Sequence, residues 1–279
     1  MQIKLYNNIM ALVFSHLQIG DNINIISIIR YLRKKYNEVH LVVLDKYLSN
    51  IKSFYSDDTS IKFIIVNTMN NWWQTNDYFN QIPFNDFNPN DIYIGGELRK
   101  HFNKYNNSWD NTPLNIYEDM NIQYNIFWDH FYIPTTDKMK HLYNSLNGMK
   151  YIFMHGSTSL GKAFDINYVL NKINKNKDDI IVIDPNINQY NIGDKYYKLA
   201  NQFINHNVHD YMEVMINAEQ LFLSNSCFFC LAIHLKINTN NCYVYFREGT
   251  NKYKSYDYIW NDKFGYNINS GFKKFITIL

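Results

Sequence analysis

Short apolar runs alternate along the chain with stretches whose apolar residues recur at helical spacing. In the first half, the apolar runs predict four strands, a buried one over residues 9–15 and three more over 39–44, 61–66 and 91–94. A turn at 18–21 and a broad apolar face over 23–32 follow the first strand, and the face predicts a helix that runs into three basic residues. A strand, a turn, a helix and another strand within about forty residues form a βαβ unit, which indicates a largely parallel sheet.

The second half repeats this alternation. Residues 112–131 are predicted to be helical and to close the first half, and the segment 134–137 then breaks the pattern. Further strands are predicted over residues 151–154, 180–183, 203–207, 221–223 and 243–246, with helices over 166–173, 208–218 and 227–235. The pattern therefore predicts an α/β fold with mainly parallel sheets, in two halves of similar size, 1–145 and 146–279.

Three loops follow predicted strands at their carboxyl ends, where open α/β sheets bind ligands. The first contains Gly20 and Asp21. Asp21 could cap the helix that follows by accepting a hydrogen bond from a backbone N–H, or it could face a ligand and take a proton from an attacking hydroxyl. Both roles remain open, and the two are compatible.

The second loop, residues 156–162, carries hydroxyl groups, glycines and one cation ahead of a predicted helix. Its polar residues include Ser157, Thr158 and Lys162. Hydroxyls, free N–H groups and a lysine at a helix N-terminus suit a phosphate group, and a solvated loop is the alternative interpretation. The spacing of Gly and Lys is not that of a Walker A loop.

The third loop, Ser224-Asn225-Ser226, leads directly from a strand into a helix. Its hydroxyls are predicted to cap that helix, and the same helix N-terminus could receive a second phosphate or a sugar hydroxyl.

Composition and charge exclude several classes of protein. The 279 residues include 27 Lys+Arg and 25 Asp+Glu, so no basic excess indicates a nucleic-acid partner. No apolar run is long enough to cross a membrane, and residues 9–14 are too short for a signal-peptide core, so we expect a cytoplasmic protein. The 42 asparagines beside 10 glycines suggest an AT-rich coding bias, which makes an asparagine weak evidence for a turn or a ligand.

The three cysteines do not indicate a disulfide framework in a chain of this length. Cys227 and Cys230 have the spacing of a redox or zinc motif, but only Cys242 and His234 lie nearby, and two phenylalanines separate the thiols. We expect these cysteines to pack in the interior, and we predict no metal site.

Other motifs are absent. The chain has no Asp-x-Asp, which metal-dependent sugar transferases use. It also lacks the Gly-x-Gly-x-x-Gly of dinucleotide sites and the Gly-x-Ser-x-Gly of α/β-hydrolases.

Taken together, the three loops resemble the heptosyltransferase-like glycosyltransferases, glycosyltransferase family nine. The opening strand, Gly20-Asp21 and a helix ending in Arg-Tyr-Leu-Arg-Lys-Lys-Tyr look like the start of that family. Ile-Phe-Met-His155-Gly-Ser with Lys162 is similar to its His-Pro-Gly-type loop, and Asn225-Ser-Cys-Phe-Phe-Cys-Leu-Ala to its Asp-Ser-Gly and His-Leu-Ala segment. Four family residues differ: Asn225 replaces an acid, Cys227 a glycine, Cys230 a histidine, and the residue before Gly156 is not proline.

The resemblance implies a GT-B-type fold, two Rossmann-like domains facing across a cleft. It implies an acceptor-side domain at 1–145 and a nucleotide-sugar-binding domain at 146–279, and a metal-independent, inverting transfer of a hexose or heptose. The acceptor would be a glycan or a lipid-linked molecule, and the only co-substrate a nucleoside-diphosphate sugar. Implied roles are catalytic base for Asp21, donor contacts for Gly156, Ser157, Thr158, Lys162, Asn225 and Ser226, and acceptor-side positions for Gly20, Trp72 and Trp73.

Two other functions fit the same scaffold. A non-hydrolysing nucleotide-sugar epimerase would need more acid and base groups than the loops supply. A catalytically degenerate glycan- or nucleotide-binding protein is favoured by the replacements at Asn225 and Cys230.

Overall fold

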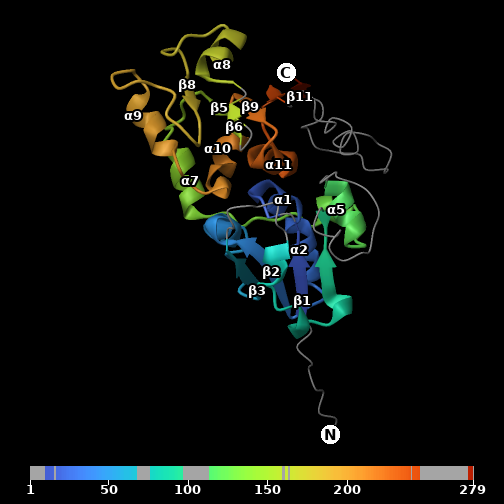
Figure 1. The fold of residues 1–279 in the computed structure, drawn as a ribbon. Helices are drawn as coiled ribbons and strands as arrows, with labels where there is room; N and C mark the ends of the chain where they lie inside the picture. Colours follow the sequence, from blue (N-terminus) through green and yellow to red (C-terminus); the bar gives the residue numbers. More distant parts are fainter. Residues whose placement is uncertain are drawn as a thin grey trace. The chain divides into compact units, whose positions relative to one another are not determined.

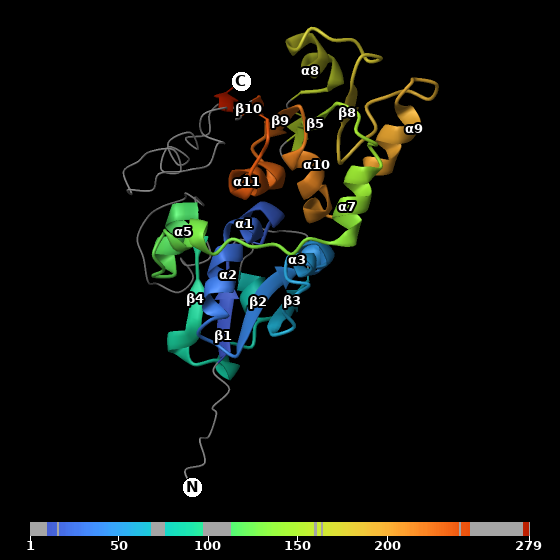
Figure 2. The same cartoon turned by 180° about the vertical axis from the view of Figure 1, so that it is seen from behind.

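The computed structural model describes residues 10–15, 17–67, 76–96, 113–158, 161–162, 164–239, 241–245 and 276–278. The chain divides into two compact units, Met1–Pro134 and Thr135–Leu279, each built on its own sheet (Figures 1 and 2). Residues 135–145, which the sequence pattern places in the first half, belong to the second unit. Helix α7 (Asp137–Asn144) packs there on η6 (Val208–Tyr211) and α10 (Met212–Ile216).

The first unit holds a four-stranded parallel sheet in the order β3-β2-β1-β4. The strands are β1 (Met10–Phe14), β2 (Glu38–Leu44), β3 (Ile61–Val66) and β4 (Ile92–Ile94), which confirms the four strands expected here. Apolar side chains of the two central strands are almost completely buried, as in a sheet covered on both faces.

The first helix of the first unit begins earlier than predicted. The residues expected to form a turn at 18–21 already lie in α1 (Ile19–Asn24), which a break at Ile25 separates from α2 (Ile26–Leu32). The Ser27 hydroxyl, in α2, donates a hydrogen bond to the carbonyl of Phe127 at 2.8 Å, which stabilises the position of this helix. The remaining helices are η1 (Asp45–Tyr47), α3 (Leu48–Ser53), α4 (Asn76–Phe79), η2 (Phe84–Asp86), η3 (Pro89–Asp91), α5 (Pro113–Asp119) and α6 (Ile126–Asp129).

The second unit holds a five-stranded parallel sheet in the order β11-β10-β9-β5-β8. Its strands are β5 (Tyr151–His155), β8 (Ile181–Ile183), β9 (Gln220–Ser224), β10 (Cys242–Tyr245) and β11 (Ile276–Ile278), and its other helices are α8 (Ile166–Lys172), α9 (Tyr197–Ala200), η5 (Asn201–Phe203) and α11 (Cys227–His234). The strand expected at 203–207 is wrong. Asn205 has a φ of 62°, which a strand cannot accommodate.

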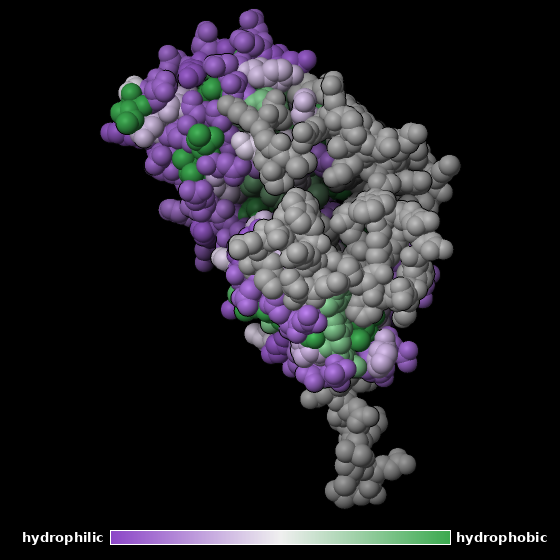
Figure 3. Space-filling view, viewed as in Figure 1, coloured by the Kyte–Doolittle hydropathy of each residue, from purple (hydrophilic) through white to green (hydrophobic). Residues whose placement is uncertain are grey.

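The surface of the second unit that carries α8 and α9 is mainly hydrophilic, with hydrophobic residues standing singly on it (Figure 3). Ile187 and Ile192 are the most exposed large hydrophobic residues that the structure describes, at 54% and 86%. Apolar residues that are exposed singly are normal on the surface of a folded domain.

Some asparagines have a structural role that the large number of asparagines in the sequence did not reveal. The described residues with a left-handed backbone are either glycines or one of four asparagines: Asn121, Asn147, Asn174 and Asn205. The first three follow the ends of α5, α7 and α8, where a left-handed residue terminates a helix, and asparagine tolerates this conformation better than other non-glycine residues. In a chain with few glycines, asparagine therefore terminates helices at positions that glycine commonly occupies.

Candidate functional site

Polar side chains gather at the carboxyl edge of the second unit's sheet, where β5, β8 and β9 end. Strand β5 lies between the other two, so the three ends are adjacent. His155 is the last residue of β5, Asp184 follows β8, and Ser224 is the last residue of β9. All three are at least 96% buried. Since a buried polar group is stable only when it is hydrogen bonded, the partners of these side chains define the site.

The imidazole of His155 connects the loops that follow β8 and β9. Its Nδ1 lies 2.9 Å from the Ser226 hydroxyl oxygen, and its Nε2 lies 3.0 Å from the Asn186 side-chain nitrogen. The ring also packs against Phe228, with 4.7 Å between centroids. Burial lowers the pKa of His155 to about 4, so near pH 7 the ring is neutral and carries a single proton.

Asp184 holds the loop that carries Asn186. The backbone N–H of Asn186 donates to one carboxylate oxygen at 2.9 Å, and the Gln189 side-chain amide donates to the other at 2.7 Å. Both oxygens of Asp184 are therefore engaged, and the Asn186 amide is held against His155.

Ser226 does not cap α11 with its side chain. It occupies the N-cap position, but its hydroxyl makes no capping hydrogen bond and faces His155 instead. The Ser224 hydroxyl does not cap the helix either, because it donates its hydrogen bond to the backbone carbonyl of His155 at 2.8 Å. The prediction that these hydroxyls cap the helix is wrong, because the end of β5 supplies closer partners.

The loop after Gly156 differs from the expected helix N-terminus. Its backbone forms a β-hairpin of two antiparallel strands, β6 (Ser157–Thr158) and β7 (Gly161–Lys162), each two residues long. Helix α8 begins only at Ile166, where the side chain of Asp165 accepts a hydrogen bond from Tyr168 and takes the cap. Lys162 therefore does not stand at a helix N-terminus. The side chains of Thr158 and Lys162 lie outside what the structure describes.

Position 156 must be glycine because the backbone there passes very close to Phe164. A Cβ at this position would lie 2.3 Å from the carbonyl oxygen of Phe164, well inside contact distance. Only glycine lets the chain leave β5 so close to the segment that leads into α8.

Asn225 lies between the end of β9 and the start of α11. Its backbone N–H donates to the Tyr245 carbonyl at 3.1 Å, which extends the pairing of β9 with β10. Its half-buried side-chain amide makes no hydrogen bond with the residues that the structure describes. This amide is therefore available to a ligand at the same edge as Ser226.

In the first unit, Gly20 and Asp21 both lie within α1, and Asp21 is in its first turn. The N-cap is Gln18, so the interpretation of Asp21 as the capping residue is wrong. Asp21 is half-buried and lies in the helix that follows β1 along the chain. Trp72 and Trp73 lie outside the described residues.

None of the three cysteines, all of which the structure describes, is in a disulfide bond, and Cys230 and Cys242 are buried. Burial raises the pKa of the Cys227 thiol to about 12, which disfavours the reactive thiolate. Among the residues with described positions, no cluster of three or more His, Cys, Asp or Glu could hold a metal ion. In the same part of the chain, no helix has the length and apolar character to span a membrane.

Two residues of this site, Asp184 and Asn186, were not predicted, and His155 was noted only as part of a loop. A signal for them was present in the sequence, because both follow the predicted strand at 180–183. The rule that ligands bind beyond the carboxyl ends of strands applies to this strand as well.

Comparison with known proteins adds the fold family. No family model matches the chain, and no curated protein matches it. Among solved structures, it is similar to a family 9 glycosyl transferase from Veillonella parvula, with a TM-score of 0.54 and 9% identity, over 99% of this chain and 87% of that one. It also matches the E. coli ADP-heptose LPS heptosyltransferase II, with a TM-score of 0.49 and 8% identity, over 97% and 90% of the two chains. As the resemblance implied, this chain has the α/β fold of two Rossmann-like units, GT-B-type, found in the family 9 enzyme from Veillonella.

Proposed function

We propose that the protein is a glycosyltransferase that moves a sugar from a nucleoside-diphosphate donor to a hydroxyl of a glycan or lipid-linked acceptor. The fold supports this class of reaction by analogy. The observation that carries the proposal is the polar cluster around His155 and Ser226 at the carboxyl edge of the second sheet. Among the described residues, the Ser226 hydroxyl contacts only His155 and the Asn225 amide has no hydrogen-bond partner. Both stand at the start of α11, where they suit the oxygens of a diphosphate.

On the donor side, we assign the diphosphate and sugar contacts to Ser226 and Asn225, together with residues of the β6–β7 hairpin. Ser157 and Thr158 would donate hydrogen bonds there, and Gly156 would let the backbone pass close by. Lys162 would neutralise the departing diphosphate, so that the reaction needs no metal ion and no further cofactor.

On the acceptor side, we assign the base to Asp21, next to Gly20, with Trp72 and Trp73 as sugar-stacking residues. The carboxylate takes the proton of the acceptor hydroxyl, whose oxygen forms a bond to the anomeric carbon. The bond from that carbon to the phosphate oxygen breaks, and its electron pair leaves with the diphosphate. A single displacement inverts the anomeric configuration.

A second candidate is a binding protein that keeps the scaffold without the transfer activity. Its support is the α11 segment, where Cys230 replaces a histidine of the resembling family and is buried. A buried thiol cannot replace an imidazole that reaches a ligand.

The binding half of the proposal is tested by thermal-shift assays with ADP, GDP, UDP, CDP and dTDP, each with and without EDTA. We expect one nucleotide to raise the melting temperature equally in both conditions, and the free nucleosides to have little effect. Stabilisation that disappears with EDTA would contradict metal independence, and no stabilisation by any nucleotide would refute the proposal.

The catalytic half is tested by Asp21→Asn, with Asp86→Asn, an exposed position in the first unit, as the matched control. We expect Asp21→Asn to bind the donor nucleotide normally and to lose at least about 100-fold in sugar transfer, within the usual range for a general base. A wild-type protein that binds the nucleotide but transfers no sugar to any acceptor would favour the binding protein.

A further inference from the structure

We propose that Ser226 is a hydrogen-bond donor to a ligand oxygen, and that His155 and Asn186 are the positioning residues that hold it in this role. The identity of the ligand, a nucleoside diphosphate, rests on the proposed function. The direction of the hydrogen bonds is a property of the protein alone and can be tested without a ligand.

The first step is the position of the proton on His155. The Ser224 hydroxyl uses its proton to donate to the His155 carbonyl, at 2.8 Å. The same Ser224 oxygen lies 3.5 Å from Nδ1 of His155, so it presents only lone pairs to that nitrogen. An unprotonated Nδ1 would face these lone pairs without a proton between them. The arrangement therefore favours the tautomer with the proton on Nδ1.

The second step is the other ring nitrogen. With the proton on Nδ1, Nε2 is a hydrogen-bond acceptor, and the Asn186 side chain places its NH₂ group 3.0 Å away. Asp184 fixes the backbone of Asn186, so this donor is held in place. The interactions of both ring nitrogens thus agree on the same tautomer.

The third step is Ser226. The Nδ1–H of His155 donates to the Ser226 oxygen at 2.9 Å, which turns the hydroxyl proton away from the ring. Within the described part of the chain, this proton has no acceptor, and the half-buried side chain does not cap α11. An oxygen at the start of this eight-residue helix would accept the proton and would also lie at the positive end of the helix dipole. An anionic oxygen, such as that of a diphosphate, is therefore the class of ligand that fits.

The tautomer is tested by NMR on the full chain labelled with ¹⁵N-histidine, with the His155 signals assigned from their loss in His155→Asn. At pH 7 we expect a protonated Nδ1 and an unprotonated Nε2. The opposite pattern would overturn the inference, since Ser226 would then donate to His155 and have no proton for a ligand. This readout uses wild-type protein without a ligand.

The positioning role is tested by a double-mutant cycle on the affinity for the nucleoside diphosphate selected by the thermal-shift screen, measured by calorimetry. Ser226→Ala removes one hydrogen bond to a charged group and is expected to weaken binding about 10- to 100-fold. His155→Phe should cost a similar factor, and the double variant should bind no more weakly than either single one. If the two factors multiply in the double variant, His155 does not act through Ser226 and the positioning role is refuted.

Three further variants serve as comparisons in the same experiment. His155→Asn, whose amide offers an N–H near the position of Nδ1, should restore affinity to within about threefold of wild type, far less than the loss of a charged hydrogen bond. Asn186→Leu should shift the NMR pattern towards a mixture of tautomers. Ser145→Ala, in the same unit, should leave affinity unchanged. If wild type binds no nucleotide, the proposed function fails, and the NMR pattern alone then decides the inference.

Discussion

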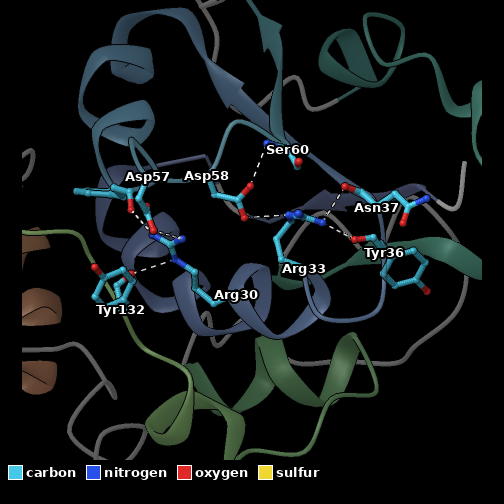
Figure 4. A network of polar contacts seen from close by, with 9 residues as sticks. Arg30, Arg33, Tyr36, Asn37, Asp57, Asp58, Ser60 and Tyr132 are labelled. Carbon is cyan, nitrogen blue, oxygen red and sulfur yellow. Dashed lines mark hydrogen bonds and ion pairs between the residues drawn. The ribbon is translucent and has the colours of Figure 1, made fainter.

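Two polar networks of similar size occupy different units of the molecule and are built in opposite ways. In the first unit, Arg30 donates to both carboxylate oxygens of Asp57, at 2.7 and 3.0 Å, and to the carbonyls of Phe54 and Tyr132, at 3.0 and 3.2 Å (Figure 4). Its guanidinium also lies over the ring of Tyr55, 5.3 Å from the centroid. In the second unit, the neutral imidazole of His155 links Asn186 to Ser226.

The difference lies in where each network ends. The Arg30 network is closed, because four of the guanidinium's hydrogen bonds end on acceptors of the same unit. The His155 network is open, because it ends at the half-buried Ser226 hydroxyl, whose proton has no acceptor in the described part of the chain. A closed network stabilises the fold, whereas an open one indicates a place for a ligand. The predictions below test this distinction.

The largest expected effect on stability comes from Gly156→Ala, which disrupts the open network. The new Cβ would lie 2.3 Å from the Phe164 carbonyl oxygen, so the end of β5 and the segment that leads into α8 must separate. We expect the second unit to lose about 3 kcal/mol of stability, the upper part of the range for overpacking. Hydrogen exchange of β5 and β9 peptides in urea measures the loss.

Gly148→Asn is the matched control. Gly148 has a φ of 72° but nothing within 4 Å of an added Cβ, and asparagine tolerates this backbone. We expect a cost below about 1 kcal/mol, the scale of a glycine backbone effect. A cost for Gly156→Ala no larger than this would mean that the segment leading into α8 moves freely and that the site is not rigid.

The second prediction concerns pH. The pKa of His155 is about 4 in the folded protein and ordinarily 6.5, so between these values the unfolded chain binds more protons. Stability therefore rises with pH across this window and is lost as the pH falls from 6.5 to 4, by up to about 1.4 kcal/mol per pH unit, or about 3 kcal/mol in all.

Urea denaturation of wild type and His155→Asn at pH 4 to 7 measures this effect. Burial also lowers the pKa of His234, to about 3, which adds a slope of the same sign to both proteins. The difference between their slopes is therefore the relevant quantity. Equal slopes would mean that His155 takes up its proton in the folded state as easily as in the unfolded chain.

The third prediction concerns the closed network. Arg30→Met keeps the aliphatic stem and removes the hydrogen bonds and the cation–π contacts, leaving Asp57 without its partner. Because Asp57 is one-third exposed, we expect a loss of about 2 kcal/mol, less than for a fully buried pair. Nucleotide affinity should not change.

Lys52→Met, an exposed control in the same unit, should alter stability by less than about 0.5 kcal/mol. Loss of nucleotide affinity in Arg30→Met would show that the closed network also serves binding.

The sequence predicted the sheets much better than the site. The strand at 61–66 has the predicted bounds, because its β-branched and aromatic residues favour an extended backbone even in a partly buried strand at the sheet edge. The helix start at Ile19 was missed because Gly20 and Asp21 favour turns by local propensity. Asn186 and Ser226 lie 31 and 71 residues from His155 along the chain, so only the pairing of β5 with β8 and β9 brings them together. The direction of their hydrogen bonds is not encoded in any local pattern.

The smallest expected effect comes from Asn225→Asp, which restores the acid of the resembling family at the open end of the second network. Because the Asn225 amide has no hydrogen-bond partner in the described residues, stability should change by less than about 0.5 kcal/mol. If Asn225 faces the diphosphate, a negative charge about 6 Å from it in a water-like medium costs about 0.7 kcal/mol, roughly threefold in affinity at low salt. The effect should shrink as salt screens the charges. Calorimetry at two salt concentrations measures both, with Asn217→Asp in the same unit as the control. Tighter binding by Asn225→Asp would place this residue beside hydroxyl groups of the donor instead of its phosphates, and would leave Ser226 as the main phosphate contact of the open network.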